Sequence, residues 1–416
     1  MEFKTNNKYI FYIIGLAFLA RMLFLIFFVD LKSSNYWEFG YIGENLKAGK
    51  GYSLFYFTDD KLNQIYDSNS TPYPSAFMPP VYVYYLYPFL FIDNDVSRNI
   101  LLIFSQIIIS LITIFLVYKF CIKYFSKNIA LISSLIIAIV PEFIYITTIF
   151  NAVNHYHLFI ICFFMLILSE DIFHNKRKIF LFSFFASMLI LLRSEFVLFL
   201  AFVYIILLIK RKFSFTFTSA ILILLFISPW IIRNAIVFDD FIPLSTSGGL
   251  NFYRGHNPER IGYWGDEYFL SEIKVNTSGN NFELMYNDYY YNKAFNFAKE
   301  NPVQEIKNSF LKVYHLWIFN TNDKRSFNLG YMIPSLIIII FSILGIIKSF
   351  NLRKYYIIYI FILSATLTVI LFFALPRYQI MMKIALIPFC SLYMEQLFNR
   401  IKRKNVIISY KYLKKR

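Results

Sequence analysis

Charged residues are scarce in this sequence: they make up 16% of its 416 residues, whereas hydrophobic residues make up 58%. An ordinary soluble domain carries about 25% charged residues. A chain this apolar cannot cover its own surface with polar groups, which excludes a set of soluble domains and predicts a membrane protein. The net charge is nevertheless +16. The placement of the basic residues is therefore the first question, because in membrane proteins it reports topology.

Cysteine is scarce as well. The three cysteines lie within or at the end of apolar runs, at Cys121, Cys162 and Cys390. The polar loops lack cysteine, which excludes a disulfide framework and a cysteine-based zinc site. No small-residue cleavage site follows the first apolar run, so we expect a retained span and no removed signal peptide. Internal repeats of 20–50 residues are also lacking, which excludes a solenoid.

Long apolar runs are plentiful. They lie near 9–29, 98–119, 129–150, 154–172, 179–194, 196–210, 214–237, 329–347, 355–375 and 379–397. Runs of this kind predict an all-α polytopic integral membrane protein with about ten transmembrane helices. A further run, 78–92, is too short for a comfortable span and alternates tyrosine with aliphatic residues. We expect it to form an interfacial or re-entrant juxtamembrane helix, because tyrosine favours the headgroup region.

The positions of the basic clusters agree with a topology of ten spans under the positive-inside rule. With the N-terminus cytoplasmic, each cluster of lysine and arginine between spans falls inside, as does the tail from Arg400 with its eight basic residues. The two long loops that then face outward, 30–78 and 238–328, hold more acidic than basic residues. The predicted protein is a multi-pass cell-membrane protein with both termini cytoplasmic. It has a seven-span module (1–237, first outer loop 30–96), an extracytoplasmic domain (238–328), a three-span module (329–398) and a basic tail (399–416). Two helices are expected in the outer domain, at 283–300 and 302–318.

Three arginines stand at the outer ends of spans, where the positive-inside rule does not place them: Arg193, Arg233 and Arg377. Arginine is suited to bidentate phosphate binding, so the three together indicate an anionic partner at the outer membrane surface. The alternative is that they anchor helix ends at headgroups or pair with acids such as Glu195.

Charges in mid-span are few, mainly Arg21 and Glu142, which disfavours a solute channel or transporter. The two histidines His155 and His157 would point about 200° apart on a helix and make a poor pair of metal ligands. We expect core or interface histidines there. Nucleic-acid binding is set aside, because the basic tail adjoins a span and can contact anionic lipid.

The first outer loop holds the candidate catalytic group. A helix is expected to run to about Ala48 and to stop at Gly49 and Gly51. On it, Glu38 shares one face with Tyr41 and Asn45. A carboxylate near the bilayer surface, opposite phosphate-binding arginines, is suited to act as a general base on an acceptor hydroxyl. A solvated loop glutamate is the alternative.

Several motifs, in order along the chain, resemble those of the polytopic family 39 glycosyltransferases of the GT-C superfamily. This family is related to the dolichyl- and polyprenyl-phosphate-sugar-dependent mannosyl- and aminoarabinosyltransferases. The stretches that carry the resemblance are 38–53 (EFGYIGENLKAGKGYS), 74–82 (PSAFMPPVY), 229–234 (PWIIRN), 241–251 (FIPLSTSGGLN), 255–258 (GHNP) and 377–378 (RY).

This resemblance implies a GT-C fold and transfer of a sugar, with inversion, from a polyprenyl-phosphate donor to a lipid, glycan or protein acceptor on the extracytoplasmic face. In that interpretation Glu38 is the base. The donor phosphate binds Arg233, Arg377 and Arg193, and the substrate-binding residues are Tyr41, Asn45, Tyr82, His256 and Asn257. Many relatives have Asp where this chain has Asn35, which leaves open whether a second carboxylate is needed. No metal-binding residues are predicted; a divalent metal stays open as a cofactor. The alternatives are a flippase or transporter of lipid-linked glycans, and a non-catalytic envelope-assembly subunit.

Overall fold

The computed structural model describes residues 8–32, 35–58, 61–63, 71–258, 282–321 and 323–413. It is built almost entirely of helices, apart from one hairpin in which β1 (Tyr56–Thr58) pairs antiparallel with β2 (Lys61–Asn63). Six of the described helices are long and apolar enough to cross a membrane. They are α1 (Lys8–Phe28), α4 (Asp95–Tyr124), α10 (Phe213–Phe238), α15 (Leu329–Lys348), α16 (Leu352–Leu371) and α17 (Pro376–Leu413).

Each of the ten apolar runs contains a helix, but four of them form helices of only 13 to 17 residues. These are α5 (Lys127–Ile139), α7 (Val153–Ile167), α8 (Lys176–Leu192) and α9 (Phe196–Ile209). The expected single span at 129–150 is wrong in detail. Its chain breaks at Val140, and a short α6 (Pro141–Tyr145) follows. The all-helical, polytopic prediction is confirmed.

Proline explains the break, and Arg21 stabilises it. Pro141 has no N–H, so it leaves the carbonyl of Ile137 without its usual i→i−4 donor. The guanidinium of Arg21, which is fully buried in α1, donates to the carbonyls of Ile137 (3.1 Å) and Ala138 (3.2 Å) and to Phe143 (3.3 Å). The guanidinium supplies hydrogen-bond donors to the carbonyls at the break, and the carbonyls supply acceptors to the buried cation. Neither group has water to pair with inside a membrane.

A second buried charge ties the C-terminal helices to this break. Lys383 on α17 donates to Glu142 Oε2 at 2.6 Å and to Ser335 Oγ on α15 at 2.7 Å. Lys383 is fully buried and Glu142 is 4% exposed. The pair therefore connects α6, α15 and α17 where an unpaired charge would be costly.

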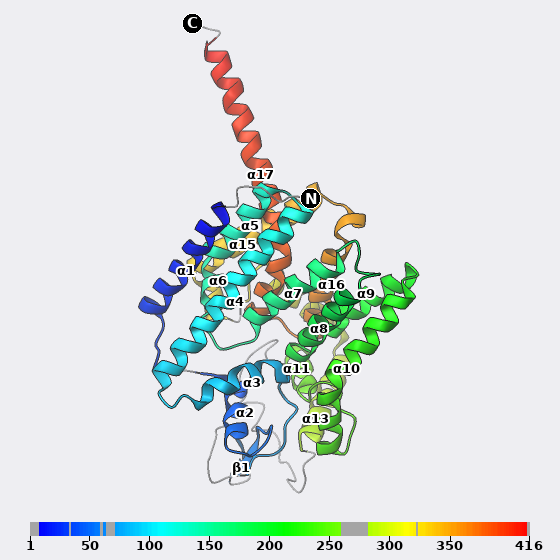
Figure 1. Ribbon diagram of the computed structural model, residues 1–416. Coiled ribbons are helices and arrows are strands. Elements are labelled where there is room, and N and C mark those ends of the chain that lie inside the picture. Colours follow the sequence, from blue (N-terminus) through cyan, green and yellow to red (C-terminus); the bar gives the residue numbers. More distant parts are fainter. Residues whose placement is uncertain are drawn as a thin grey trace.

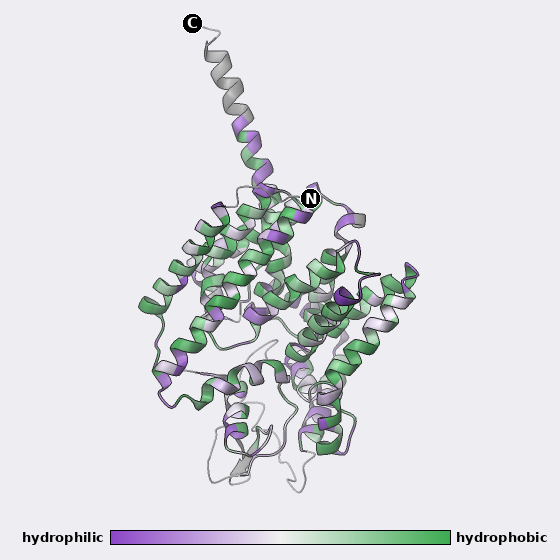
Figure 2. Cartoon of the chain, in the orientation of Figure 1, coloured by the Kyte–Doolittle hydropathy of each residue, from purple (hydrophilic) through white to green (hydrophobic). Residues whose placement is uncertain are grey.

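The polar segments gather at one end of the helical bundle, here called the loop end (Figure 1). It contains α2 (Trp37–Lys47), the hairpin, α3 (Pro80–Leu86), the 3-10 helix η1 (Tyr87–Phe91), α11 (Gly248–Gly255) and α13 (Phe282–Glu300). The start of α1 and the protruding end of α17 lie at the opposite end (Figure 1). Figure 2 shows apolar helices between these ends and hydrophilic residues at the loop end and along the base of the α17 extension.

The region 238–328 is not an independent unit. Its last long helix, α14 (Pro302–Trp317), packs on α16 and α17, and η2 (Lys324–Phe327) leads into α15. The helices expected at 283–300 and 302–318 are present within one residue of their predicted ends. The segment 78–92 forms α3 and η1, which are too short to span, as predicted. The predicted tail continues α17 as far as Leu413.

Large apolar side chains point outward from the spanning helices. Phe27 on α1 is 71% exposed, and Ile236 on α10 is 77% exposed. Such exposure over many neighbouring residues is unfavourable in water and normal in contact with lipid. The chain is therefore a multi-pass membrane protein in which the bilayer covers the outside of the bundle.

Candidate active site

Glu38 lies in the first turn of α2 and is 4% exposed. The helix begins there because Asn35 Oδ1 accepts a hydrogen bond from the Trp37 N–H at 2.8 Å, which satisfies one of the free donors of the first turn. It ends before Gly49 and Gly51, which have φ of +74° and +71°. Asn35 thus has a local structural role at the start of α2.

The predicted buried face of α2 is present in part. Asn45 shares it with Glu38, and its side-chain amide donates to the Ser53 carbonyl at 2.9 Å, so Asn45 holds the loop that follows. Tyr41 is partly exposed. Gly43 brings α2 close to η1, because a Cβ there would lie 2.4 Å from Leu90 Cδ1. This close packing fixes the position of Glu38 relative to α3.

Two of the predicted arginines meet at the start of α17. The guanidinium carbons of Arg193 and Arg377 lie 5.0 Å and 5.7 Å from the centroid of the same ring, Tyr378. Arg193 also binds Glu195, with Nε to Oε1 at 2.7 Å and Nη2 to Oε1 at 2.5 Å. The expected alternative of an Arg193–Glu195 pair is therefore realised, and Arg193 reaches Arg377 as well.

Glu38 lies within electrostatic range of Arg377. Burial and the charge of Arg193 disfavour the cationic form of Arg377, and the charge of Glu38 favours it. The cluster therefore joins a carboxylate from α2, an arginine from the α8–α9 connection, and an arginine at the N-terminus of a long helix. Such a helix N-terminus presents free N–H groups and favours anions. We call Glu38, Arg193, Glu195, Arg377 and Tyr378 the arginine cluster.

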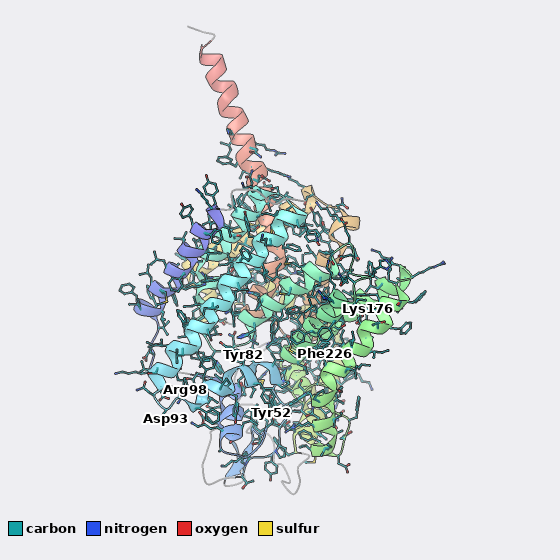
Figure 3. The ribbon with its side chains drawn as sticks, in the orientation of Figure 1. Tyr52, Tyr82, Asp93, Arg98, Lys176 and Phe226 are labelled. Carbon is teal, nitrogen blue, oxygen red and sulfur yellow. The ribbon has the colours of Figure 1, made fainter. Side chains whose placement is uncertain are left out.

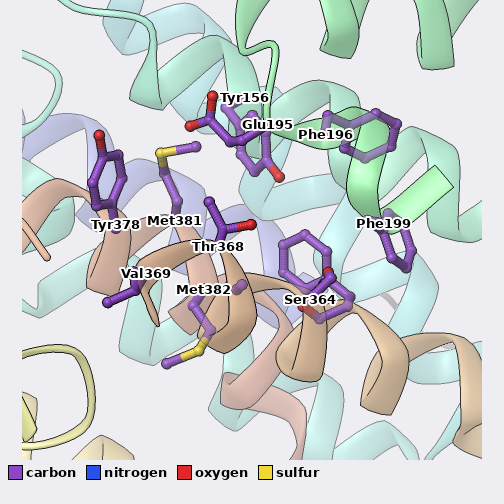
Figure 4. Close-up of a pocket in the computed structure, with 12 residues that line it drawn as sticks. Tyr156, Glu195, Phe196, Phe199, Ser364, Thr368, Val369, Tyr378, Met381 and Met382 are labelled. Atoms are coloured by element: carbon purple, nitrogen blue, oxygen red, sulfur yellow. Dashed lines mark hydrogen bonds between the residues drawn. The ribbon is translucent and has the colours of Figure 1, made fainter. Parts of the chain in front are cut away.

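A small, mainly apolar pocket of about 40 Å³ adjoins the arginine cluster and is lined in part by Glu195 and Tyr378 (Figure 4). It lies between α7, α9, α16 and α17, and most of its remaining lining is apolar. That lining includes Phe196, Phe199, Phe361, Val369, Met381 and Met382. The pocket therefore has one charged lining residue, Glu195, among mainly apolar ones.

Arg233 is placed differently. Its guanidinium donates to the carbonyls of Tyr52 and Ser75, both at 2.6 Å, and stacks near Trp230 at 5.3 Å. Tyr52 lies at the loop end (Figure 3). The structure therefore uses Arg233 to fasten the first loop to α10, and its described contacts are with that loop rather than with Arg193 or Arg377. Its expected role in donor binding stays a prediction.

His256 and Asn257 are buried and engaged. His256 Nδ1 lies 2.6 Å from Glu305 Oε2, and its Nε2 lies 2.9 Å from the Leu371 carbonyl and 3.3 Å from Lys312 Nζ. The Asn257 amide donates to carbonyls at the end of α11, those of Tyr253 and Arg254. Desolvation lowers the pKa of the fully buried Lys312 to about 8. The contacts of these residues connect α11, α14 and α16 and are separate from the contacts described for the arginine cluster.

Sequence reasoning missed three residues. Tyr378 belongs to the motif at 377–378, but no pattern in the sequence indicates that its ring lies beside both Arg193 and Arg377. Lys383 was overlooked within an apolar run. Glu283 on α13 is 1% exposed, and its Oε2 accepts hydrogen bonds from the Ala76 N–H (2.8 Å) and the Thr246 hydroxyl (2.6 Å). Burial raises the pKa of Glu283 to about 7. Partners 37 and 207 residues away leave no local pattern to detect.

No group of three or more histidine, cysteine, aspartate or glutamate side chains suited to a metal ion occurs among the described residues. Metal use therefore stays open.

Comparison with known proteins identifies the central part of the chain. Residues 78–232 match the model of the dolichyl-phosphate-mannose-protein mannosyltransferase family. This match covers 155 of the 416 residues, so the central part of the chain is similar to a glycosyltransferase family. The matched residues begin just before α3 and end within α10, and they include Tyr82 and Arg193. Glu38 and Arg377 lie outside the matched residues.

Solved structures extend the fold similarity beyond the matched residues. The apo oligosaccharyltransferase of Archaeoglobus fulgidus matches with a TM-score of 0.54 at 12% identity, over 97% of this chain and 52% of that one. The oligosaccharyltransferase AglB of the same organism, in complex with an inhibitory peptide and a dolichol-phosphate, matches with a TM-score of 0.56 at 13% identity and the same coverage. The chain thus spans about half the length of these relatives. No curated protein matched.

Proposed function

We propose that this protein transfers a sugar from a polyprenyl-phosphate-linked donor to an acceptor hydroxyl, with inversion. The observation that carries the proposal is the arginine cluster: Arg193 and Arg377 lie beside the ring of Tyr378 at the N-terminus of α17, and the buried carboxylate of Glu38 favours the cationic form of Arg377. The family match to dolichyl-phosphate-mannose-dependent enzymes, and the dolichol-phosphate and peptide of the AglB complex, support this donor class. A lipid, a glycan and a protein all fit as acceptor.

In the proposed reaction, Glu38 takes the proton of the acceptor hydroxyl as its oxygen attacks the anomeric carbon. The bond from that carbon to the phosphate oxygen breaks, and its electrons leave with the polyprenyl phosphate. A single displacement of this kind inverts the anomeric centre. Arg377 and Arg193 stabilise the departing phosphate, together with the N-terminus of α17. Phosphate leaves readily, so a general acid is less necessary than in glycoside hydrolysis.

The pocket beside Glu195 and Tyr378 supports the lipid part of the proposal. Tyr378, which lines the pocket, also lies beside Arg193, and the other lining residues are mostly apolar side chains that a lipid chain could contact. A donor placed with its phosphate at the arginines would direct its lipid between α9 and α16. Burial of apolar surface stabilises such a chain by about 25 cal/mol per Å².

The loop end is proposed to face the extracytoplasmic side, with both termini cytoplasmic. The basic residues near the start of α1 and along the tail favour the cytoplasm for the opposite end. The start of α1 and the α17 extension do lie together there (Figure 1). The active site then works on lipid-linked sugars at the outer surface.

The flippase alternative requires charged residues along a path through the membrane. Arg21 is instead engaged by backbone carbonyls at the break between α5 and α6, and Lys383 is engaged by Glu142. These contacts favour a packing role for the intramembrane charges, and therefore favour the transferase.

The test replaces Glu38 by Gln and compares this variant with Glu44→Gln, a matched change on the same helix outside the buried face. Cells lacking the protein are complemented with wild type or either variant, and their envelope glycans and glycoproteins are analysed by mass spectrometry. We expect E38Q to lose product by about 10²–10⁴-fold, the contribution of a general base, and E44Q to restore it. Full product with E38Q, at equal protein level, would overturn the role of Glu38.

A further inference from the structure

Two neighbouring side chains at the loop end are buried without a hydrogen-bond partner among the residues that the structure describes. They are His155 at the start of α7, whose ring nitrogens are both unpaired, and Tyr82 on α3, whose hydroxyl is unpaired. Their exposed fractions are 5% and 1%. An unsatisfied buried donor or acceptor costs about 1–3 kcal/mol. Such groups are rare in native proteins, and a ligand is one common explanation.

The two rings lie close to each other and to α2, the helix that carries the candidate base. The ring centroids of Tyr82 and His155 are 5.4 Å apart, and the centroid of Phe39 lies 4.9 Å from that of Tyr82. Phe39 directly follows Glu38 on α2. Figure 3 shows Tyr82 between the helical bundle and the polar segments of the loop end. The unpaired groups therefore lie at the junction of α2, α3 and α7.

The tyrosines next to these two side chains do have hydrogen-bond partners. The hydroxyl of Tyr85, whose ring lies 4.1 Å from His155, pairs with Ser105. The hydroxyl of Tyr36 donates to Asn99 Oδ1. The same environment therefore supplies partners to the neighbouring tyrosines and none to Tyr82 or His155.

Aromatic faces with a few polar groups are the chemistry that binds a sugar ring, because a sugar has hydroxyls around its rim and C–H groups on its faces. Neutral histidine offers one donor and one acceptor, and tyrosine offers both functions from one oxygen. We propose that His155 and Tyr82 bind hydroxyl groups of the donor's sugar and hold it beside Glu38. This inference rests on the proposed transferase function and names the part of the site that recognises sugar.

A trapped water molecule is the competing explanation, since one water can satisfy several buried polar groups. The two explanations differ in what they predict for ligands. Sugar recognition predicts that His155 and Tyr82 matter for a sugar-bearing lipid and not for the same lipid without its sugar. A structural water predicts that they matter for stability alone.

The experiment measures binding of dolichyl-phosphate mannose and of bare dolichyl phosphate to the purified full-length protein in detergent. The variants are Tyr82→Phe and His155→Phe, and the matched control is Tyr84→Phe on the same helix, where the tyrosine is 55% exposed. We expect each of the first two to weaken binding of the sugar-bearing lipid about tenfold, as the loss of one hydrogen bond does. Binding of bare dolichyl phosphate should stay within about twofold, and Tyr84→Phe should change neither.

Melting temperatures separate this outcome from misfolding. Because the removed groups have no protein partner, both variants should melt at or above the wild-type temperature. Lower melting temperatures with unchanged affinities would show a structural water and overturn the inference. Equal affinity of wild type for the two lipids would overturn it too. If wild type bound neither lipid, the proposed function itself would fail.

Discussion

Replacement of Arg233 by Lys tests whether Arg233 has a structural role or binds the donor phosphate. The guanidinium of Arg233 joins two carbonyls at the two ends of one loop segment, Tyr52 and Ser75, each at 2.6 Å. A lysine ammonium has a single nitrogen and cannot reproduce the planar fork that spans both acceptors. We therefore expect R233K to release one end of the segment between these residues.

The magnitude follows from these contacts. Loss of one hydrogen bond to a charged donor costs about 1.5–3 kcal/mol, and weaker stacking on Trp230 and Tyr52 costs about 0.5–1 kcal/mol more at a partly exposed site. The total is about 2–4 kcal/mol. Thermal unfolding in detergent should show a fall of several degrees in melting temperature. Limited proteolysis should show faster cleavage between residues 52 and 75.

The matched variant is Arg377→Lys, in the arginine cluster. We expect R377K to weaken binding of dolichyl phosphate about tenfold, because a bidentate contact is lost, whereas R233K binds it within about twofold of wild type below its melting temperature. A tenfold loss of affinity in R233K with an unchanged melting temperature would refute the reasoning. Arg233 would then belong to the donor site, as the sequence motif predicts.

Two further changes test the loop end. The pKa of Glu283 is raised from 4.5 to about 7 by burial, so its contribution to stability is fully present below about pH 4.5 and is lost as the pH rises through 7. Glu283→Gln should flatten the dependence of melting temperature on pH between 5 and 8, and an unchanged slope would contradict this. Gly249→Ala should lower the melting temperature, since a Cβ there would lie 1.9 Å from the Asn287 carbonyl oxygen and overpacking costs about 1–3 kcal/mol. Gly15→Ala, where nothing lies within 4 Å of the added Cβ, is the control and should have no such effect.

The helices were predictable because their signals are local. Hydropathy located the ten apolar runs. The boundaries of α13 and α14 follow from Asn301-Pro302, because proline is favoured in the first turn of a helix and disfavours helix in the residue before it. The end of α2 follows from Gly49 and Gly51. The expected single span at 129–150 failed because Pro141, although visible, was not given its full effect on the helix before it.

The candidate site was predictable only as separate residues. The motifs pointed to Glu38 and Arg377, and the position of Arg193 at the outer end of a span pointed to that arginine. The place of the Tyr378 ring beside both arginines depends on how α17 meets the α8–α9 connection. The Lys383–Glu142 pair joins residues 241 positions apart, and Arg233 could be separated from the other arginines only by its contacts with Tyr52 and Ser75. Long-range pairs of this kind leave no periodicity in the sequence.

The contact between Arg21 and the break at Pro141 has a consequence for the order in which the protein is assembled. The acceptor carbonyls of Ile137 and Ala138 are synthesised 116 and 117 residues after Arg21. At about 5–20 residues per second, α1 is made roughly 6 to 23 s before them. During that interval an arginine stands in the first span without its final partners, at a cost of about 2.5–3.5 kcal/mol on insertion scales. Lateral docking of α1 against α4 and α5 removes this cost, so the arrival of α5 in the membrane drives the closure of the N-terminal bundle.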